Sequence, residues 1–440
     1  MKKLIIIGAG PGGYEVAFEA AKEGLDVTLI EKHKVGGTCL NYGCIPTKTL
    51  YRSAEIAKIL DKSTKLGIES SYTVNMKHVI KNKDDVVSKL AKGIEFLIKK
   101  HNIKFVYGEA SFVDSKTVKV EDELISGDYF LIATGSTASI LPIPGVDSES
   151  VITSKEALEL ENVPKSLTVI GGGVVGLELA SIYNYLGSDV TVLEYQKNLL
   201  GMFEEDVTKR FKGVLKKQGV NVITSAEVKE ISGNKTIYNI KDETYSIEAE
   251  YILMAVGRKP YFDNLGLENT NIRFSANGIE VDEHFMTSEE NVYAVGDCIG
   301  GMMLAHTATY QSYYVLSHIL NKTNLTDFNY TPACVFTYPE IASIGYTRSQ
   351  AQEKYDNIEI KKSMYSANGK ANAMDETEGF IQIILSDGFV VGAAIMGYSA
   401  STIIHEIATI IHSGKKLEEY RDMIYAHPTL SEVLGMLIRE

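Results

Sequence analysis

Two cysteines five residues apart carry the most specific chemical signal in this chain of 440 residues. Cys39 and Cys44 lie within the run Gly-Gly-Thr-Cys-Leu-Asn-Tyr-Gly-Cys-Ile-Pro-Thr-Lys, residues 36–48. On a regular helix, residues at this spacing have Cα atoms about 8 Å apart, beyond the roughly 7 Å limit for a disulfide. A redox-active disulfide therefore needs an irregular helix start, which Gly43 and Pro46 would permit. Cys44 would then lie near a helix N-terminus, which favours the reactive thiolate.

The alternative interpretation is a pair of buried cysteines that stay reduced. The flanking Gly-Gly-Thr and Pro-Thr-Lys segments make this alternative the weaker one, and Pro46 suits the first turn of a helix that begins near the second cysteine. We therefore expect the chain to move electrons through a disulfide.

A candidate base lies near the C-terminus, in the run His-Pro-Thr-Leu-Ser-Glu from His427 to Glu432. Dithiol chemistry needs a group that removes a thiol proton and returns it, and histidine titrates in the useful range. Glu432 would orient the ring and stabilise the imidazolium. The structural alternative is a capping box from Thr429 to Glu432 that opens a helix, with His427 simply preceding it. The cysteine pair favours the acid–base interpretation.

The elements that must position these groups begin with a glycine-rich turn. A strand-like segment leads into Gly8, Gly10 and Gly13 in the pattern Gly-x-Gly-x-x-Gly, and a helical segment follows. The next strand-like segment ends at Glu31, at the distance expected of a carboxylate that binds a ribose hydroxyl. Together these features predict a dinucleotide-binding fold.

The same pattern returns 163 residues later, where Gly171, Gly173 and Gly176 precede a strand-like segment that ends at Glu194. Two nucleotides are therefore expected. The first copy adjoins the cysteines and should hold a flavin, because a flavin exchanges electrons with a dithiol and also exchanges hydride. The second copy should hold a nicotinamide, and NAD is favoured over NADP because Glu194 would repel a 2′-phosphate and no arginine follows it.

Composition excludes several other classes of function. The 57 acidic side chains outnumber the 44 basic ones and give a net charge of −13, which argues against nucleic acid and anionic membrane surfaces as partners. Four cysteines are too few for the disulfide scaffold of a secreted chain of this length, and no stretch approaches the roughly 18 apolar residues of a membrane span. A cytoplasmic location is therefore predicted.

These motifs resemble the dihydrolipoyl dehydrogenase family of flavin-dependent pyridine nucleotide-disulfide oxidoreductases over essentially the whole chain. The redox run is similar to that family's, with Thr47 in place of the usual serine, and residues 427–432 and 339–345 resemble two further family signatures. Two segments depart from the family pattern: Tyr310–Ser312, where a Glu-Gly pair is common, and Tyr398–Thr402, which lacks a proline and a glutamate.

The resemblance implies roles for individual residues. Cys39 would be the interchange thiol that meets the lipoyl disulfide, and Cys44 would contact the isoalloxazine ring. Lys48 and Glu178 would pair beside the flavin. The remaining cofactor contacts expected are, for FAD, Gly8, Gly10, Gly13, Glu31, Ala133, Thr134, Gly135, Asp297 and Ala305 and, for NAD, Gly171, Gly173, Gly176, Glu194 and Gly257.

It also implies a ping-pong enzyme that oxidises the dihydrolipoyl group of a lipoylated carrier protein and reduces NAD⁺. Such an enzyme is the shared component of 2-oxoacid dehydrogenase, acetoin or glycine cleavage complexes. The expected assembly is a homodimer in which the partner subunit supplies His427 and Glu432.

The predicted fold class is α/β, with two Rossmann-like domains for FAD and NAD and a C-terminal α+β dimerisation domain. Strand-like segments at 380–385 and 389–395, followed by a helical run at 403–411, indicate the last of these. The expected boundaries are 1–142 for the first part of the FAD domain with the redox disulfide, 143–262 for the NAD domain, 263–325 for the second part of the FAD domain, and 326–440 for the dimerisation domain.

Three other functions stay open from the sequence. One is a related NAD(P)H-dependent reductase of another disulfide or of a metal ion. The others are a non-catalytic flavoprotein that senses redox state and an oxygen-using NADH oxidase, which would not need a cysteine pair with a base.

Overall fold

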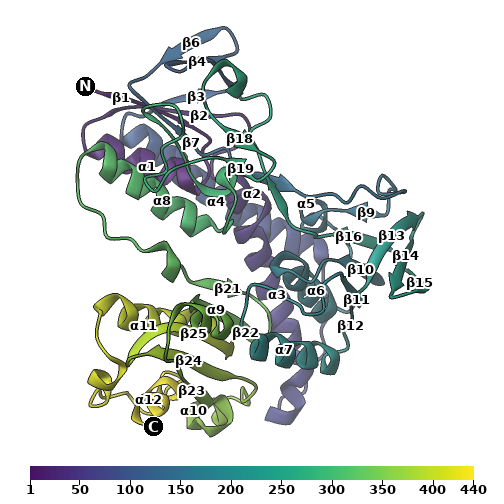
Figure 1. The fold of residues 1–440 in the computed structure, drawn as a ribbon. Helices are drawn as coiled ribbons and strands as arrows, with labels where there is room; N and C mark the ends of the chain where they lie inside the picture. Colours follow the sequence, from purple (N-terminus) through teal and green to yellow (C-terminus); the bar gives the residue numbers. More distant parts are fainter.

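Two parallel sheets and one antiparallel sheet organise the chain, and the computed structural model describes residues 1–440 (Figure 1). The first sheet has the strand order β20-β7-β1-β2-β3. Residues 4–7 are all buried, as expected of a parallel strand covered on both faces. The strands of this sheet are β1 (Lys3–Ile7), β2 (Asp26–Glu31), β3 (Lys104–Tyr107), β7 (Tyr129–Ile132) and β20 (Val292–Ala294).

Helices of the first unit include the one that carries the second cysteine. An antiparallel sheet of β4 (Ala110–Asp114), β5 (Thr117–Val120) and β6 (Glu123–Ser126) lies beside the parallel one (Figure 1). The helices are α1 (Pro11–Lys22), α2 (Gly37–Tyr42), α3 (Cys44–Lys62), α4 (Met76–Lys100) and α8 (Ala305–Ile319).

The second parallel sheet has the order β12-β11-β10-β16-β9 and forms the teal unit of Figure 1. Its strands are β9 (Val151–Ile152), β10 (Ser166–Ile170), β11 (Asp189–Glu194), β12 (Asn221–Thr224) and β16 (Tyr251–Met254), with helices α5 (Ser154–Ala157), α6 (Val174–Leu186) and α7 (Glu205–Lys217). An antiparallel extension contains β13 (Glu227–Ser232), β14 (Lys235–Ile240) and β15 (Glu243–Glu248).

Short elements join the two parallel units. After β16 the chain returns to the first sheet, because β20 pairs with β7. The joining elements are β8 (Ser136–Ala138) paired with β17 (Arg258–Pro260), β18 (Phe274–Ser275) paired with β19 (Gly278–Ile279), and the 3₁₀ turns Leu267–Asn269 and Gly296–Ile299.

The predicted duplication is confirmed down to single hydrogen bonds. In the first copy the Glu31 carboxylate accepts from the Ala9 amide at 2.8 Å and from the His33 amide at 2.7 Å. In the second copy the Glu194 carboxylate accepts from the amides of Gly172 at 2.6 Å and Gln196 at 2.5 Å. Each carboxylate at the end of a second strand therefore braces the glycine turn after the first strand.

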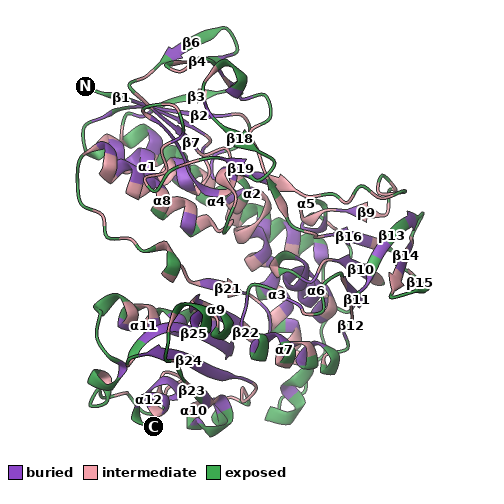
Figure 2. Cartoon of the chain, viewed as in Figure 1, coloured by how far each residue is buried: buried purple, intermediate pink, exposed green.

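The third unit is an antiparallel sheet with the order β21-β22-β25-β24-β23. Isoleucines of α11 and apolar side chains of α12 pack with this sheet in one core, and β24 and β25 are almost entirely buried (Figure 2). Its elements are β21 (Ala333–Val335), β22 (Glu340–Gly345), α9 (Arg348–Lys354), β23 (Glu359–Met364), α10 (Gly369–Ala373), β24 (Phe380–Ser386), β25 (Phe389–Gly397), α11 (Ala400–Ser413) and α12 (Glu432–Arg439). The 3₁₀ turns Ser63–Leu66, Phe328–Tyr330, Tyr365–Ala367 and Leu417–Tyr420 complete the chain.

The α/β class expected from the sequence is therefore observed, and no helix combines the length and apolar character needed to cross a bilayer. The predicted strand at 380–385 and the predicted helix at 403–411 are both present within β24 and α11.

Two glycine-to-alanine substitutions distinguish the effect of tight packing on stability from the effect of helix propensity. A Cβ at Gly13 would lie 1.8 Å from the Gly8 carbonyl oxygen, so we expect Gly13→Ala to destabilise the protein by about 1–3 kcal/mol. A Cβ at Gly93 in α4 would meet nothing within 4 Å, so Gly93→Ala should stabilise it by up to about 1 kcal/mol. Thermal unfolding of both variants measures the difference, and equal unfolding midpoints would contradict the close packing of α1 on β1.

Candidate active site

One groove of about 2960 Å³ connects the carboxyl ends of the two parallel sheets. Open parallel sheets bind ligands at this edge. The two cysteines line the same groove as the glycine turns of the two folds. The groove walls include, of the residues predicted from the sequence, Gly8, Gly10, Glu31, Cys39, Cys44, Lys48, Ala133, Thr134, Gly135, Gly171, Gly173, Glu178, Glu194, Gly257, Asp297 and Ala305.

The helices α1 and α6 both begin at this groove, where their N-termini suit a pyrophosphate. A Cβ at Gly173 would meet no protein atom within 4 Å, and one at Gly10 only the Gly37 Cα at 3.9 Å. The glycines thus leave open a cradle that any side chain would begin to fill. The residues present therefore fit dinucleotides at both helix starts.

The third glycine of each turn acts differently from the prediction that it borders the cofactor. Gly13 and Gly176 do not line the groove. A Cβ at Gly176 would lie 2.2 Å from the Gly171 carbonyl oxygen, and the matching distance at Gly13 is 1.8 Å. These two glycines let a helix pack tightly on its strand, and so they shape the site without lining it.

The cysteine pair lies at a break between two helices. Gly43, with φ −143° and ψ −110°, separates α2, which contains Cys39, from α3, which begins at Cys44 as the sequence predicts. The hydroxyl of Thr47, the residue that replaces the family's serine, donates to the Gly43 carbonyl at 2.7 Å and fastens the break. Both thiols are free in this structure.

The electrostatics of the two thiols differ. A hydrogen bond from Cys39 lowers the pKa of Cys44 to about 7, with the Lys48 ammonium acting in the same direction and burial opposing both. The same hydrogen bond and burial raise the pKa of Cys39. Cys44 is therefore the thiol that holds a negative charge when the pair is reduced.

An ion pair fastens the helix that carries Cys44. The Lys48 Nζ lies 2.8 and 3.0 Å from the two carboxylate oxygens of Glu178, whose side chain is 5% exposed. The Phe336 amide donates to the same carboxylate at 2.9 Å, and the Lys48 ammonium lies 4.4 Å from the centre of the Phe336 ring. This pair links α3, α6 and the start of the third unit.

Asp297 is held at the groove by contacts that the sequence did not reveal. The Ser136 hydroxyl donates to the Asp297 carboxylate, and Arg258 donates to the Ser136 hydroxyl and carbonyl oxygens, both at 2.7 Å. Gln311, within a segment that departs from the family pattern, accepts from the Gly296 amide at 2.7 Å. Although this segment departs from the family pattern, its Gln311 side chain still supports the turn that contains Gly296, directly before Asp297.

The candidate base and its carboxylate lie together. His427 Nδ1 is 3.0 Å from Glu432 Oε1, and the hydrogen bond from the Thr429 amide to Glu432 is the main cause that lowers the pKa of this carboxyl. The capping box that stood as the structural alternative is only half formed, because the Thr429 hydroxyl donates to the Ala426 carbonyl and α12 begins at Glu432 itself. The Glu432 carboxylate thus accepts a hydrogen bond from the loop backbone and also contacts the His427 imidazole.

Two further contacts hold this loop and were missed from the sequence. Buried Asn368 donates to the Thr429 carbonyl at 2.9 Å, and the Ser431 hydroxyl donates to Glu406 of α11 at 2.5 Å. Their sequence separations of 61 and 25 residues leave no local signal, although Ser431 lies inside the His-Pro-Thr-Leu-Ser-Glu run.

A single chain does not bring the base to the thiols. The His427 side chain is 76% exposed, and neither it nor Glu432 lines the groove that contains Cys39 and Cys44. The two halves of the predicted catalytic group therefore lie on separate surfaces of one chain.

Comparison with known proteins agrees with this architecture. A family model described as pyridine nucleotide-disulphide oxidoreductase matches residues 2–312, and the model of that family's dimerisation domain matches residues 331–438. The dihydrolipoyl dehydrogenase of Staphylococcus aureus is 40% identical, covering 98% of this chain and 94% of the relative. The dihydrolipoyl dehydrogenase of Bacillus subtilis is 38% identical, covering 98% and 96%.

Solved structures give the same picture. The HOCl-induced flavoprotein disulfide reductase RclA of Escherichia coli superposes with a TM-score of 0.89 at 28% identity, over 99% of both chains. LpdA of Mycobacterium tuberculosis superposes with a TM-score of 0.92 at 25% identity, over 100% of this chain and 99% of that one. RclA has also been solved as a Cu(II) complex.

The acidity of Cys44 can be measured in the reduced protein by iodoacetamide labelling at a series of pH values, with mass spectrometry of its peptide. Labelling should rise with pH around a midpoint of about 7, because the thiolate reacts. Cys39→Ala and Lys48→Met should each shift the midpoint upward, since each removes a group that favours the thiolate.

Lys58→Met is the matched control, because this lysine of α3 lies against Tyr185 instead of the thiols. A midpoint that stays unchanged in both Cys39→Ala and Lys48→Met would contradict the assignment of Cys44 as the stabilised thiolate.

Proposed function

The chain belongs to the pyridine nucleotide-disulphide oxidoreductase family, and we propose that it catalyses the dihydrolipoyl dehydrogenase reaction, with NAD⁺ as the electron acceptor. The observation that carries this function is that the Cys39 and Cys44 thiols share one groove with two dinucleotide cradles. A dithiol in this position can exchange electrons with a carrier on one side and a nucleotide on the other.

The overall reaction balances without any further reactant. A dihydrolipoyl group loses two electrons and two protons and becomes the cyclic lipoyl disulfide. NAD⁺ gains two electrons and one proton as a hydride, and the second proton passes to solvent. Bound FAD supplies a ring that exchanges electron pairs with thiols and with nicotinamide.

The chain's own groups carry out the thiol exchange. A lipoyl thiolate attacks Cys39 of the enzyme disulfide, which forms a mixed disulfide and releases Cys44 as the thiolate that the helix start stabilises. The second lipoyl thiolate attacks the lipoyl sulfur bound to Cys39, which closes the lipoyl ring and frees the Cys39 thiolate. His427 takes a lipoyl proton, and Glu432 holds the opposite ring nitrogen so that the imidazole keeps its orientation.

The position of the thiols decides which nucleotide fold binds which cofactor. FAD is assigned to the first fold because the two cysteines lie next to it, and NAD is assigned to the second. Glu31 and Asp297 would hold FAD, with the Lys48–Glu178 pair beside its ring, and Glu194 would bind the ribose of NAD. The absence of a cation next to Glu194, other than Lys197 three residues on, supports NAD over NADP.

We assign the missing base to a second copy of the chain. The matched dimerisation domain supports a homodimer, and His427 is preceded in the chain by the apolar residues Met423 and Ile424, which are 45% and 93% exposed. In a homodimer that buries this surface, His427 and Glu432 of each chain would lie beside the thiols of the other chain. The assembly would act in the cytoplasm on a lipoylated carrier protein.

A related reductase of another disulfide or of a metal ion is the second candidate, because RclA, which forms a Cu(II) complex, shares the fold. The His427–Glu432 pair favours the thiol substrate, since reduction of a metal ion needs no base that returns a proton to sulfur.

The substrate is tested by following NADH formation from dihydrolipoamide with the purified, FAD-loaded protein, and NADP⁺ serves as the comparison acceptor. We expect turnover with NAD⁺ and a His427→Gln variant slowed by about 10²–10⁴-fold, the usual contribution of a general base. His78→Gln, at an exposed histidine of α4, is the matched control. A folded, FAD-containing protein without turnover would rule out lipoamide as the substrate.

The shared site is tested with mixed dimers of a Cys39→Ala chain and a His427→Gln chain. Each homodimer should be nearly inactive. If the base comes from the partner, half of the dimers in a statistical mixture contain one intact site, which gives about a quarter of wild-type activity. If the base acted within its own chain, no mixed dimer would contain an intact site, and the mixture would stay inactive.

A further inference from the structure

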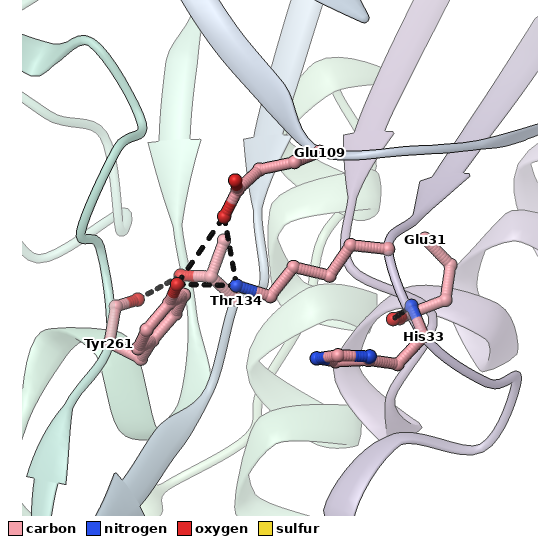
Figure 3. A network of polar contacts seen from close by, with 6 residues as sticks. Glu31, His33, Glu109, Thr134 and Tyr261 are labelled. Carbon is pink, nitrogen blue, oxygen red and sulfur yellow. Dashed lines mark hydrogen bonds and ion pairs between the residues drawn. The ribbon is translucent and has the colours of Figure 1, made fainter. Parts of the chain in front are cut away.

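A cluster of three side chains lies next to Glu31, beside the first nucleotide site. Lys32 directly follows the ribose carboxylate Glu31 at the end of β2, and its Nζ lies 3.8 Å from the centre of the Tyr261 ring and 3.0 Å from Glu109 Oε1 (Figure 3). Lys32 also donates to the Tyr261 hydroxyl, which lies 3.4 Å from the same carboxylate oxygen. We call Tyr261, Lys32 and Glu109 the tyrosine cluster.

The backbone fixes Tyr261 in this position. Its amide donates to the Gly135 carbonyl at 2.9 Å, and its carbonyl oxygen accepts from the Thr134 hydroxyl (Figure 3). The residue follows β17, so the chain leaving the second nucleotide fold is pinned to the turn after β7 of the first. The ring is thereby placed on the wall of the groove.

The order of groups along the groove indicates what the cluster faces. The start of α1 suits a pyrophosphate, and Glu31 suits the ribose attached to it. Lys32 directly follows Glu31 in the chain and lines the groove together with Tyr261, and the base follows the ribose in a dinucleotide. The cluster therefore lies where an adenine belongs.

The charge of the cluster fits a neutral base better than a phosphate. The Lys32 ammonium is already paired with Glu109 and stacked on the ring, so it offers little free positive charge. The hydrogen bond from Lys32 lowers the pKa of Glu109, so the pair stays ionised at neutral pH.

The second nucleotide fold provides an internal comparison. The residue equivalent to Lys32, 163 positions later, is Tyr195, whose side chain is 66% exposed. No ion pair or cation–π contact involving Tyr195 occurs in the structure. The residue after the ribose carboxylate is thus held by contacts in the first fold and is exposed in the second.

We propose that the tyrosine cluster is a clamp on the adenosine end of FAD that slows its release, whereas the second site, where Tyr195 is exposed, lets NAD exchange at each turnover. The inference rests on the proposed function in one respect, which is that FAD occupies the first fold. It assigns to Tyr261, Lys32 and Glu109 a positioning role in cofactor retention.

The clamp is tested by the rate at which FAD leaves the purified holoenzyme, measured as the rise in flavin fluorescence after dilution. We expect Tyr261→Ala to release FAD about tenfold faster, from loss of the ring that the Lys32 ammonium contacts and of the hydrogen bonds of the Tyr261 hydroxyl. Tyr261→Phe keeps the ring and should change the rate less than Tyr261→Ala does. The KM for NAD⁺ should not change in either variant.

Tyr245→Ala is the matched control, because this tyrosine also bonds a glutamate, Glu243, but lies on the β14–β15 hairpin away from the groove. Lys32→Met removes the cation while Tyr261 stays, and it should also accelerate release. It keeps the test decisive if Tyr261→Ala fails to fold.

Competition by AMP for the apoprotein separates a clamp from general destabilisation. Weaker AMP binding in Tyr261→Ala, with an apoprotein that unfolds at the wild-type temperature, would support the clamp. FAD release at the wild-type rate in both Tyr261→Ala and Lys32→Met would overturn it. A wild-type protein that binds FAD but does not oxidise dihydrolipoamide would overturn the proposed substrate alone, whereas one that binds no FAD would overturn both.

Discussion

The break between α2 and α3 at Gly43 is the constraint on which the rest of the site depends. A continuous helix would hold the two thiols too far apart to react with each other. The break instead places Cys44 at a helix start, within hydrogen-bonding reach of Cys39, so that one sulfur holds charge and the other keeps its proton. The two sheets, their glycine turns and the groove serve to bring nucleotides to this one point.

Helix α3 also joins the three units of the molecule. Lys48 pairs with Glu178 of the second nucleotide fold, and the Tyr51 hydroxyl donates to the Thr337 carbonyl at the entrance to the third unit at 2.8 Å. The helix that begins with the redox thiol is therefore the one that fixes the relative placement of both nucleotide sites. A displacement of either unit would therefore change the position of Cys44.

Local features could be predicted from the sequence, and long-range contacts could not. The strands that end at Glu31 and Glu194 and the helix that starts at Cys44 follow from glycine spacing, apolar runs and proline placement. The capping box, which was the structural alternative for residues 429–432, is only half formed, because the Thr429 hydroxyl donates to the Ala426 carbonyl and Glu432 is shared with His427. No local sequence pattern predicts the contacts of Tyr261 with Lys32, because 229 residues separate the two positions in the chain. The domain boundaries and the chemical roles of the site residues stay predictions.

The matching hydrogen bonds of Glu31 and Glu194 have an evolutionary meaning. Two segments that repeat both their glycine turns and the bracing of those turns by a carboxylate are best explained by duplication of one ancestral gene segment. After such an event the brace had to be kept in each copy, because it shapes the turn itself. The residue that follows the brace differs between the copies, Lys32 in the first and Tyr195 in the second. A single ancestral pocket could in this way give rise to one site that retains its nucleotide and another that exchanges it.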